Sequence, residues 1–252
     1  MINICIFGSS TPAGESFIRQ IRDKKVNWNI YCYSRSNEKN TCIDLNKPNE
    51  FIPITSDQES IWISFSPIWL FANFFSFLSS HQSEKLKGIK GVIACSSSSS
   101  ITKRFSSNLY DRQLSKKLLS AENKLVESCK DISLNLSILR PSLVYGKVGK
   151  YKDKNISKLI YLLRKAPFLP IPLNSGLRQP IHASQLALIT LDISNKIIDG
   201  LDSSLIPNCI EIGGDTTLSY NKMLKLLIKA LPKGDPGKKC ILIPIPNRIF
   251  NF

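Results

Sequence analysis

The residues best placed to do chemistry come first in the chain. An apolar run over residues 2–7 leads straight into Gly8, and Gly14 follows six residues later. The run predicts a strand, and Gly8 lets the chain leave that strand in a conformation closed to residues with a Cβ. Gly14 would let a following helix press against the sheet. The spacing therefore predicts a strand, a tight turn and a helix.

The turn between these two glycines is suited to bind phosphate. Thr11 can cap the helix and Pro12 fits its first position. The backbone N–H groups at such a helix start, around Ser10 and Thr11, point outward and carry partial positive charge. A dinucleotide pyrophosphate can bind there. An ordinary turn after a buried first strand is the alternative interpretation.

The end of the predicted second strand bears on the kind of dinucleotide. It reads YSRS at residues 33–36, with no acidic residue to bond both ribose hydroxyls. The guanidinium of Arg35 has the fork that matches a 2′-phosphate. This favours NADP over NAD, and a solvated loop arginine is the alternative.

Strands alternate with helices along the chain, which is typical of a parallel sheet with covering helices. We therefore expect an α/β fold: a doubly wound, Rossmann-like parallel sheet with a small C-terminal α/β substrate lobe. A dinucleotide-binding domain is predicted over 1–146 and the substrate lobe over 147–252. The predicted strands cover 2–7, 29–33, 41–45, 60–65, 90–95, 135–139 and 209–212, and the predicted helices cover 15–23, 115–129, 155–165, 184–198 and 219–231.

Cysteine and histidine usage argues against disulfides and metals. The 7 cysteines are odd in number, scattered and never spaced as C-x-x-C, which is typical of reduced thiols in a cytosolic protein. His81 and His182 are far apart and lack ligand spacing around them, so no metal site and no histidine-based triad is predicted. The start of the chain lacks the basic region of a secretory signal, and we expect a cytoplasmic protein.

One uncharged stretch, IWISFSPIWLFANFFSFL at 61–78, is rich in aromatic residues. Pro67 near its centre, its polar side chains and the alternation in its first half favour a buried strand that leads into a surface helix over a membrane span. Contact of this aromatic helix with a membrane surface stays open.

The net charge is +15, with 34 Lys and Arg against 19 Asp and Glu, so an anionic partner is expected. No motif of a nucleic-acid-binding fold accompanies the charge, and no nucleic-acid partner is predicted. Lysines are spread along the whole chain, and a lysine-rich background composition is the alternative explanation.

The order of the motifs resembles one known family. A glycine turn, Asp44 and Leu45 after the third strand, a serine cluster after the fifth and LRPSLVYG after the sixth are followed by RQPIHASQLA and IGGDTTLSYNKML. This order covers nearly the whole chain and resembles the extended and atypical short-chain dehydrogenase/reductases of the NAD-dependent epimerase/dehydratase family. The RPSLVYG and RQPIH blocks, with their mutual spacing, are the most specific parts.

The resemblance implies a site for NADP, which Arg35 favours, or for NAD. Asp44 would accept from the exocyclic amine of adenine, with a turn-forming Asp as the alternative. Thr11 departs from the family's three-glycine turn, and its side chain would crowd the pyrophosphate unless its hydroxyl contacts a phosphate. The implied cofactor-binding residues are Gly8, Ser10, Thr11, Gly14, Arg35, Asp44, Leu45, Pro141 and Ser142.

The catalytic helix is where the chain departs from the family. Members usually carry Tyr-x-x-x-Lys on the helix after the serine cluster, where the lysine lowers the pKa of the tyrosine. When Glu122 is matched to the glutamate usual on this helix, Leu114 and Leu118 occupy the two catalytic positions. The standard pair is therefore absent.

Two kinds of catalytic candidate remain. Ser97 and Ser98 lie where the family's hydroxyl would hydrogen-bond the substrate oxygen, although a serine-rich turn is the simpler interpretation of any one of them. Tyr110, between the cluster and the helix, is the best substitute acid. The cation that would lower the pKa of Tyr110 would have to come from elsewhere in the chain, and Lys103 and Arg112 are the candidates.

The later RQPIH block supplies candidate substrate residues. In relatives this block lies near the substrate nucleotide or the lobe interface. Arg178 is the better candidate for binding phosphate, and for His182 buried hydrogen bonding is the simpler role.

These features imply an NADP- or NAD-dependent enzyme acting on a nucleotide-linked or lipid-linked sugar. Epimerisation, dehydration and keto reduction, all through hydride transfer, stay open, and the cofactor would carry the hard chemistry. The alternative is an NAD(P)-binding protein without turnover, with an assembly or redox-sensing role, which the missing pair favours. The expected partner is a small-molecule sugar substrate, and a homodimer stays open.

Overall fold

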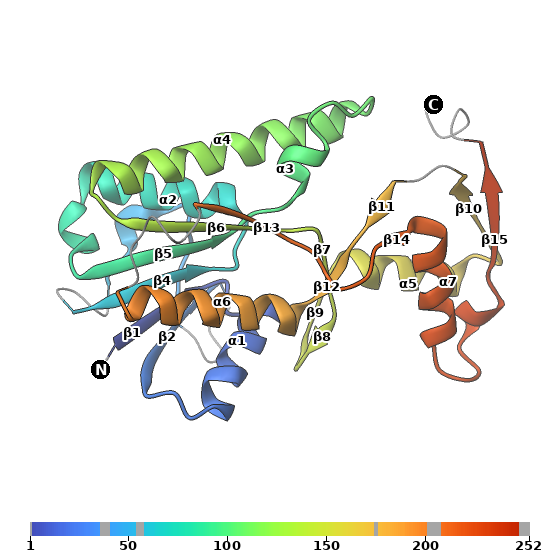
Figure 1. Ribbon diagram of the computed structural model, residues 1–252, viewed down its shortest axis with the longest axis horizontal. Coiled ribbons are helices and arrows are strands. Elements are labelled where there is room, and N and C mark those ends of the chain that lie inside the picture. The colour runs from blue at the N-terminus through green and yellow to red at the C-terminus, as the bar shows by residue number, and fades with distance from the viewer. Residues whose placement is uncertain (1, 36–40, 54–57, 174–175, 201–207, 247–252) are drawn as a thin grey trace.

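A seven-stranded parallel sheet forms the centre of the computed structural model, which describes residues 2–35, 41–53, 58–173, 176–200 and 208–246 (Figure 1). Its strands are β1 (Ile2–Phe7), β2 (Trp28–Ser34), β3 (Thr41–Cys42), β4 (Ser60–Ser64), β5 (Ile89–Cys95), β6 (Asn135–Pro141) and β13 (Cys209–Ile212). They lie in the order β13-β6-β5-β4-β1-β2-β3, with each neighbouring pair parallel. The expected doubly wound, Rossmann-like α/β fold is confirmed.

Helices cover both faces of this sheet (Figure 1). α1 (Pro12–Asp23) and α6 (Ala183–Ile198) pack on one face, and α2 (Ile68–His81) and α4 (Leu109–Asp131) pack on the other. Short α3 (Ser99–Thr102) precedes α4. The two helical layers close two separate hydrophobic cores.

The strand sequences explain why two layers are needed. Ile4 and Ile6 of β1 belong to the core under α1 and α6, whereas Cys5 and Phe7 belong to the core under α2 and α4. Successive side chains of a strand point to opposite faces, so a nearly continuous apolar run is buried only in a sheet that is covered twice.

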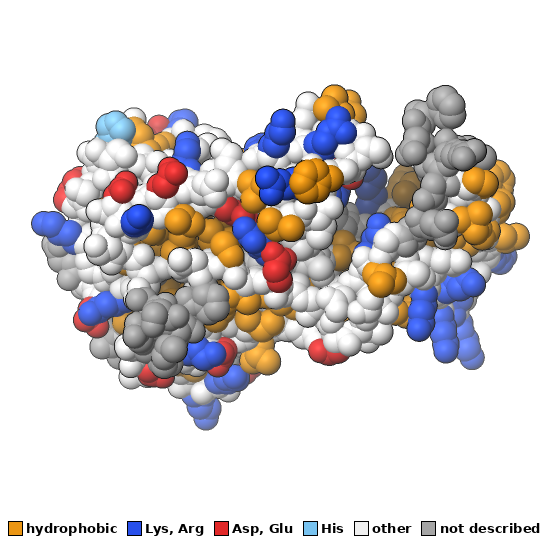
Figure 2. Space-filling view, turned by 45° about the horizontal axis from the view of Figure 1, so that its top comes forward, with side chains coloured by type: hydrophobic (Ala, Val, Ile, Leu, Met, Phe, Trp, Pro, Cys, Tyr) orange, Lys and Arg blue, Asp and Glu red, His pale blue; other side chains and the backbone are white. Residues whose placement is uncertain are grey.

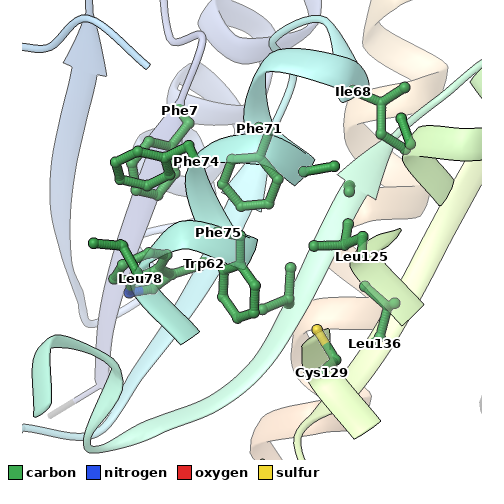
Figure 3. Close-up of a cluster of buried hydrophobic side chains, with 14 of the residues drawn as sticks. Phe7, Trp62, Ile68, Phe71, Phe74, Phe75, Leu78, Leu125, Cys129 and Leu136 are labelled. Atoms are coloured by element: carbon green, nitrogen blue, oxygen red, sulfur yellow. The ribbon is translucent and has the colours of Figure 1, made fainter. Parts of the chain in front are cut away.

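The uncharged stretch at 61–78 forms most of β4 and α2, as the sequence favours. Phe71, Phe74 and Phe75 of α2 are fully buried in one core with Phe7 and Trp62 (Figure 3). The ring centroid of Phe7 lies 5.0 Å from that of Trp62 and 5.2 Å from that of Phe71. These aromatic side chains are therefore in the core and do not form a membrane face. Among the described residues, no helix has the length and apolar character to cross a membrane.

Several predicted elements differ in extent, and the helix predicted at 15–23 begins at Pro12. The strand expected at 41–45 pairs only over Thr41–Cys42. The helix expected from residue 115 begins at Leu109, because the side chain of Asn108 accepts hydrogen bonds from the N–H groups of Tyr110 and Asp111 and caps the helix there.

Later segments build a smaller part beside the sheet. β7 pairs with β12 in parallel, β10 with β15 in parallel, and β11 with β14 antiparallel. Three short 3-10 helices, η1 (Pro48–Glu50), η2 (Ser83–Leu86) and η4 (Pro236–Lys239), complete the described elements. The remaining strands and helices are β7 (Leu143–Tyr145), β8 (Lys147–Val148), β9 (Tyr151–Lys152), α5 (Asn155–Lys165), β10 (Phe168–Pro172), β11 (Leu177–Arg178), β12 (Pro180–His182), β14 (Leu218–Ser219), α7 (Tyr220–Ala230) and β15 (Ile241–Ile245).

The smaller part is not one continuous stretch of sequence. α6 packs against α1, and β13 pairs with β6, so both return to the main sheet. The Arg164 guanidinium and the Asp235 carboxylate, 2.8 Å apart, join α5 to the start of η4. The domain boundary after residue 146 stays a prediction. Two later elements, α6 and β13, belong to the main sheet, so the chain passes between the sheet and the smaller part more than once.

Candidate functional site

The turn between β1 and α1 requires both of its glycines. Gly8 has a φ of +78°, and a Cβ there would lie 2.6 Å from the backbone nitrogen of Ser66. A Cβ at Gly14 would lie 2.7 Å from the carbonyl oxygen of Gly8. Both distances are shorter than carbon can approach, so any larger residue must move backbone. The helix therefore begins directly against the strand end, as the sequence predicts.

Thr11 turns its hydroxyl toward the protein. Its Oγ1 accepts a hydrogen bond from the N–H of Gly14 at 3.1 Å and donates one to the carbonyl of Gly8 at 2.9 Å. The hydroxyl therefore caps α1, as the sequence predicts. Pro12 has no N–H. At this helix start, the backbone N–H groups of Ser10 and Ala13 donate no hydrogen bond to any described residue, so they are available to a ligand.

Three candidate residues lie beyond this turn at the β2 side of the sheet. Arg35 is exposed directly after β2. The carboxylate of Asp44 accepts from the backbone N–H and the side-chain amide of Asn46, and these bonds hold the pKa of Asp44 below its usual value. Asp44 thus forms a turn of its own. Leu45 is half-buried against the core under α2 and α4.

The serine cluster is fixed to the end of β6. The N–H of Ser96 donates to the carbonyl of Leu139 and the N–H of Ser98 donates to the carbonyl of Pro141. The hydroxyl of Ser97 accepts from the N–H of Ser99 at 3.2 Å. Ser97 and Ser98 are half-buried at the carboxyl edge of the sheet, where ligands of such folds bind.

A buried charge network behind this cluster escaped the sequence analysis. The hydroxyl of Ser96 donates to the carboxylate of Glu122, which also accepts from the Arg140 guanidinium at 2.5 and 3.1 Å. The side chain of Glu122 is 2% exposed and that of Arg140 is 15% exposed. Arg140 reaches Glu211 of β13 at 3.2 Å as well. The hydrogen bonds that Arg140 donates to Glu122 raise the pKa of Arg140, which stays charged.

Helix α4 offers no acid at the matched catalytic positions. Leu118 is buried in the core under α2 and α4, and Leu114 packs against the same core. Tyr110, in the first turn of the helix, is 81% exposed. Its hydroxyl makes no hydrogen bond to any described residue. The Lys103 ammonium is 2.6 Å from the Asp111 carboxylate, so this predicted helper has a partner of its own.

The candidates after β6 are held by the smaller part. The hydroxyl of Ser142 donates to the carbonyl of Gln179, and its N–H donates to the carbonyl of Ile212. Arg178 lies with its guanidinium 4.8 Å from the ring centroid of Tyr220.

His182 is a helix cap. Its Nδ1 lies 2.7 Å from the Ser184 hydroxyl and accepts from the N–H of Ser184. The ring meets that of Tyr145 edge-on at 5.2 Å, and a Cβ at Gly146 would collide with it. Through these contacts, His182 packs the end of β12 against Tyr145 and Gly146, where the chain leaves the main sheet.

The structure brings most candidates to one edge and leaves others apart. The glycine turn, the serine cluster and Pro141 all follow parallel strands and share the carboxyl edge of the sheet. Ser66, which follows β4, completes this edge and was missed, although its position just after a buried strand is the same signal that marked the serine cluster. Among the described residues, no three His, Cys, Asp or Glu side chains gather where they could hold a metal ion.

Among the solved structures with a similar fold are a nucleotide-sugar epimerase, a reductase and a dehydratase. UDP-glucuronic acid 4-epimerase from Bacillus cereus, in complex with NAD, is 14% identical with a TM-score of 0.69, over 96% of this chain and 86% of that one. GDP-mannoheptose C4 reductase from Campylobacter jejuni, with NADP bound, is 13% identical with a TM-score of 0.64, over 97% and 87%. An NAD-dependent NDP-hexosamine 5,6-dehydratase involved in tunicamycin biosynthesis is 14% identical with a TM-score of 0.65, over 97% and 85%.

The likeness to these enzymes is one of fold. No model of a protein family and no curated protein matches the chain. The fold that the motif order implied is thus confirmed over nearly the whole chain, through structure and not through sequence identity.

Proposed function

We propose that the chain is an NADP- or NAD-dependent enzyme that acts on a nucleotide-linked or lipid-linked sugar by hydride transfer. The observation that carries the proposal is the β1–α1 turn, in which Gly8 and Gly14 bring a helix start against the carboxyl edge of the sheet. The free N–H groups of Ser10 and Ala13 fit a pyrophosphate there. The similar structures with bound NAD or NADP support the same cofactor class.

The other residues have proposed roles around that turn. Arg35, exposed after β2, would pair with a 2′-phosphate and favour NADP. Asp44 and Leu45 would border the adenine, and Pro141 and Ser142 would border the nicotinamide. When bound, the nicotinamide supplies the hydride chemistry.

The substrate would lie between the serine cluster and the smaller part. The hydroxyl of Ser97 or Ser98 would hydrogen-bond the reacting sugar oxygen. Arg178 would bind a phosphate of the substrate, with His182 positioning the segment beside it. Tyr110 is the proposed proton donor, and a substrate would have to reach the exposed start of α4 to meet it.

A second candidate function is NAD(P) binding without turnover. It is favoured by Leu114 and Leu118, because these two apolar residues occupy the positions of the usual catalytic tyrosine and lysine. Burial raises the pKa of the Cys95 thiol to about 12 and that of Cys32 to about 11, which disfavours a reactive thiolate at these two cysteines, whereas Cys42 and Cys209 are exposed. Within this alternative, an assembly role and redox sensing both stay open.

Hydride exchange separates the two candidates. The purified chain would be titrated with NADPH and NADH, and then incubated with 4-deuterated NADPH and a panel of oxidised nucleotide-linked and lipid-linked sugars. Transfer of deuterium to a sugar supports the enzyme. Binding of NADPH with no transfer across the panel would establish the second candidate, and failure to bind either dinucleotide would rule out both.

A further inference from the structure

Four large apolar side chains are exposed where the serine cluster runs into α4. Within the stretch 99–117, here called the α3–α4 tip, Phe105 is 89% exposed, Tyr110 81%, Leu109 57% and Ile101 45%. Single exposed apolar residues are ordinary, but four within ten residues form a patch of the kind that marks a contact surface. Figure 1 shows that this tip lies at the end of α4 that extends past the sheet.

The tip is also cationic. Residues 99–117 contain five Lys or Arg side chains and a single acidic one, Asp111, which is paired with Lys103. The Arg104 guanidinium lies 5.4 Å from the ring centroid of Phe105. Arg104, Phe105 and Lys116 line a hollow of about 690 Å³ along the outer side of α4. Figure 2 shows hydrophobic and basic side chains gathered together over this junction.

We propose that the α3–α4 tip binds an anionic phospholipid surface. The pattern suits that occupant because exposed Phe, Leu and Tyr side chains can enter the boundary between headgroups and acyl chains, while Arg and Lys beside them attract lipid phosphates. A nucleic acid would use the cations but would leave the aliphatic Ile101 and Leu109 without a favourable partner. An anionic phospholipid surface thus satisfies the charge and the apolar exposure of the tip together.

Binding of the α3–α4 tip to a phospholipid surface does not depend on the proposed enzyme activity. If the proposed function holds, tip binding also bears on the class of substrate. Ser98 directly precedes α3, so a bound tip would hold the serine cluster next to the lipid headgroups. A lipid-linked sugar presents its sugar there, which favours that substrate class over a soluble nucleotide-linked one.

Vesicle co-sedimentation of the full chain, without cofactor, tests the proposal. Vesicles of phosphatidylcholine alone would be compared with vesicles containing about 30 mol% phosphatidylglycerol at about 0.1 M salt. We expect binding to the anionic vesicles that weakens with added salt. The double variant Phe105→Ser, Leu109→Ser should lower binding about tenfold or more, and Arg104→Glu with Lys116→Glu should lower it by a similar factor.

Matched controls separate the tip from general charge and hydrophobicity. Ile52→Ser removes an equally exposed apolar side chain elsewhere, and Lys24→Glu reverses an exposed charge elsewhere, so both should bind as wild type. Melting temperatures would verify that all variants fold. No binding to anionic vesicles, or tip variants that bind like wild type, would overturn the proposal. So would dimerisation that depends on Phe105 and Leu109 without vesicle binding, because the patch would then be a contact between copies of the chain.

Discussion

The β1–α1 turn and helix α4 differ in what they leave available to a ligand. At the turn, Gly8 and Gly14 keep side chains out of the way, and backbone N–H groups remain open. In α4, Leu114 and Leu118 stand at the matched catalytic positions and pack into the core, and the buried Glu122 is taken by Arg140. One region keeps the geometry for binding, whereas the other has no proton donor at its usual place.

Under the proposed function, cofactor binding and proton chemistry would depend on different parts of this fold. Binding at the turn would rely on backbone groups whose positions are fixed by the φ of Gly8 and the close approach of α1. Proton transfer relies on two side chains one helical turn apart, and substituting them leaves the backbone intact. The fold can therefore be kept while the chemistry is changed or lost.

The comparison would break if α4 still carries the chemistry through Tyr110. Should hydride transfer be found, Tyr110→Phe is expected to lower turnover by about 10²–10⁴-fold, the usual contribution of a positioned acid, while the Kd for NADPH stays near wild type. Steady-state kinetics would measure this. Tyr161→Phe, at another exposed tyrosine, is the control. An equally active Tyr110→Phe enzyme would remove Tyr110 from the reaction.

Glu122 sharpens the comparison because it is the part of α4 that the fold still uses. Glu122→Ala would leave the half-buried Arg140 with only Glu211 and would remove the acceptor of the Ser96 hydroxyl, and we expect a loss of about 1–3 kcal/mol of stability in denaturant unfolding. Glu127→Ala, on the exposed side of the same helix, should change stability little. If Glu122→Ala unfolds at the wild-type denaturant concentration, the network does not support the fold.

Gly14 tests the other side of the comparison. Gly14→Val places branched carbons against the carbonyl of Gly8, so we expect α1 to shift, with a loss of up to about 3 kcal/mol and no detectable NADPH binding. Gly176→Val is the matched control, since a Cβ there meets nothing within 4 Å. A stable Gly14→Val variant with unchanged affinity would place the dinucleotide elsewhere.

Arg35 carries the smallest expected effect. Arg35→Asp should weaken NADPH by about 1–2 kcal/mol, or about 5–30-fold, and leave NADH nearly unchanged, because an exposed guanidinium is partly screened by water. Calorimetric titration of both dinucleotides would measure the ratio. Equal weakening of NADPH and NADH would remove Arg35 from phosphate discrimination.

Features that depend on local sequence could be predicted, and those that depend on distant contacts could not. The run ending at Gly8 and the apolar strands are local patterns, and they gave the fold and the turn. The approach of Ser66 to Gly8 and the network from Ser96 to Glu211 join segments far apart in the chain, which a pattern of neighbours does not report.

The direction in which a side chain points could be predicted from the sequence only in part. Thr11 was expected both to cap the helix and to crowd or contact a phosphate, and the structure confirms the cap, in which the hydroxyl is directed back to Gly8 and Gly14. Tyr110 was expected between the serine cluster and the helix, but the cap at Asn108 starts the helix early, so Tyr110 lies in the first turn of α4 with its phenol in solvent.

The central claim is that the β1–α1 turn binds a dinucleotide, and calorimetric titration of NADPH into the wild type and the milder Gly14→Ala variant tests it most directly. The account predicts one NADPH bound per wild-type chain, more tightly than NADH, and much weaker binding by Gly14→Ala, since even one methyl group collides with the Gly8 carbonyl. No heat of binding for either dinucleotide at millimolar concentration, or the same affinity in a folded Gly14→Ala variant, would contradict it.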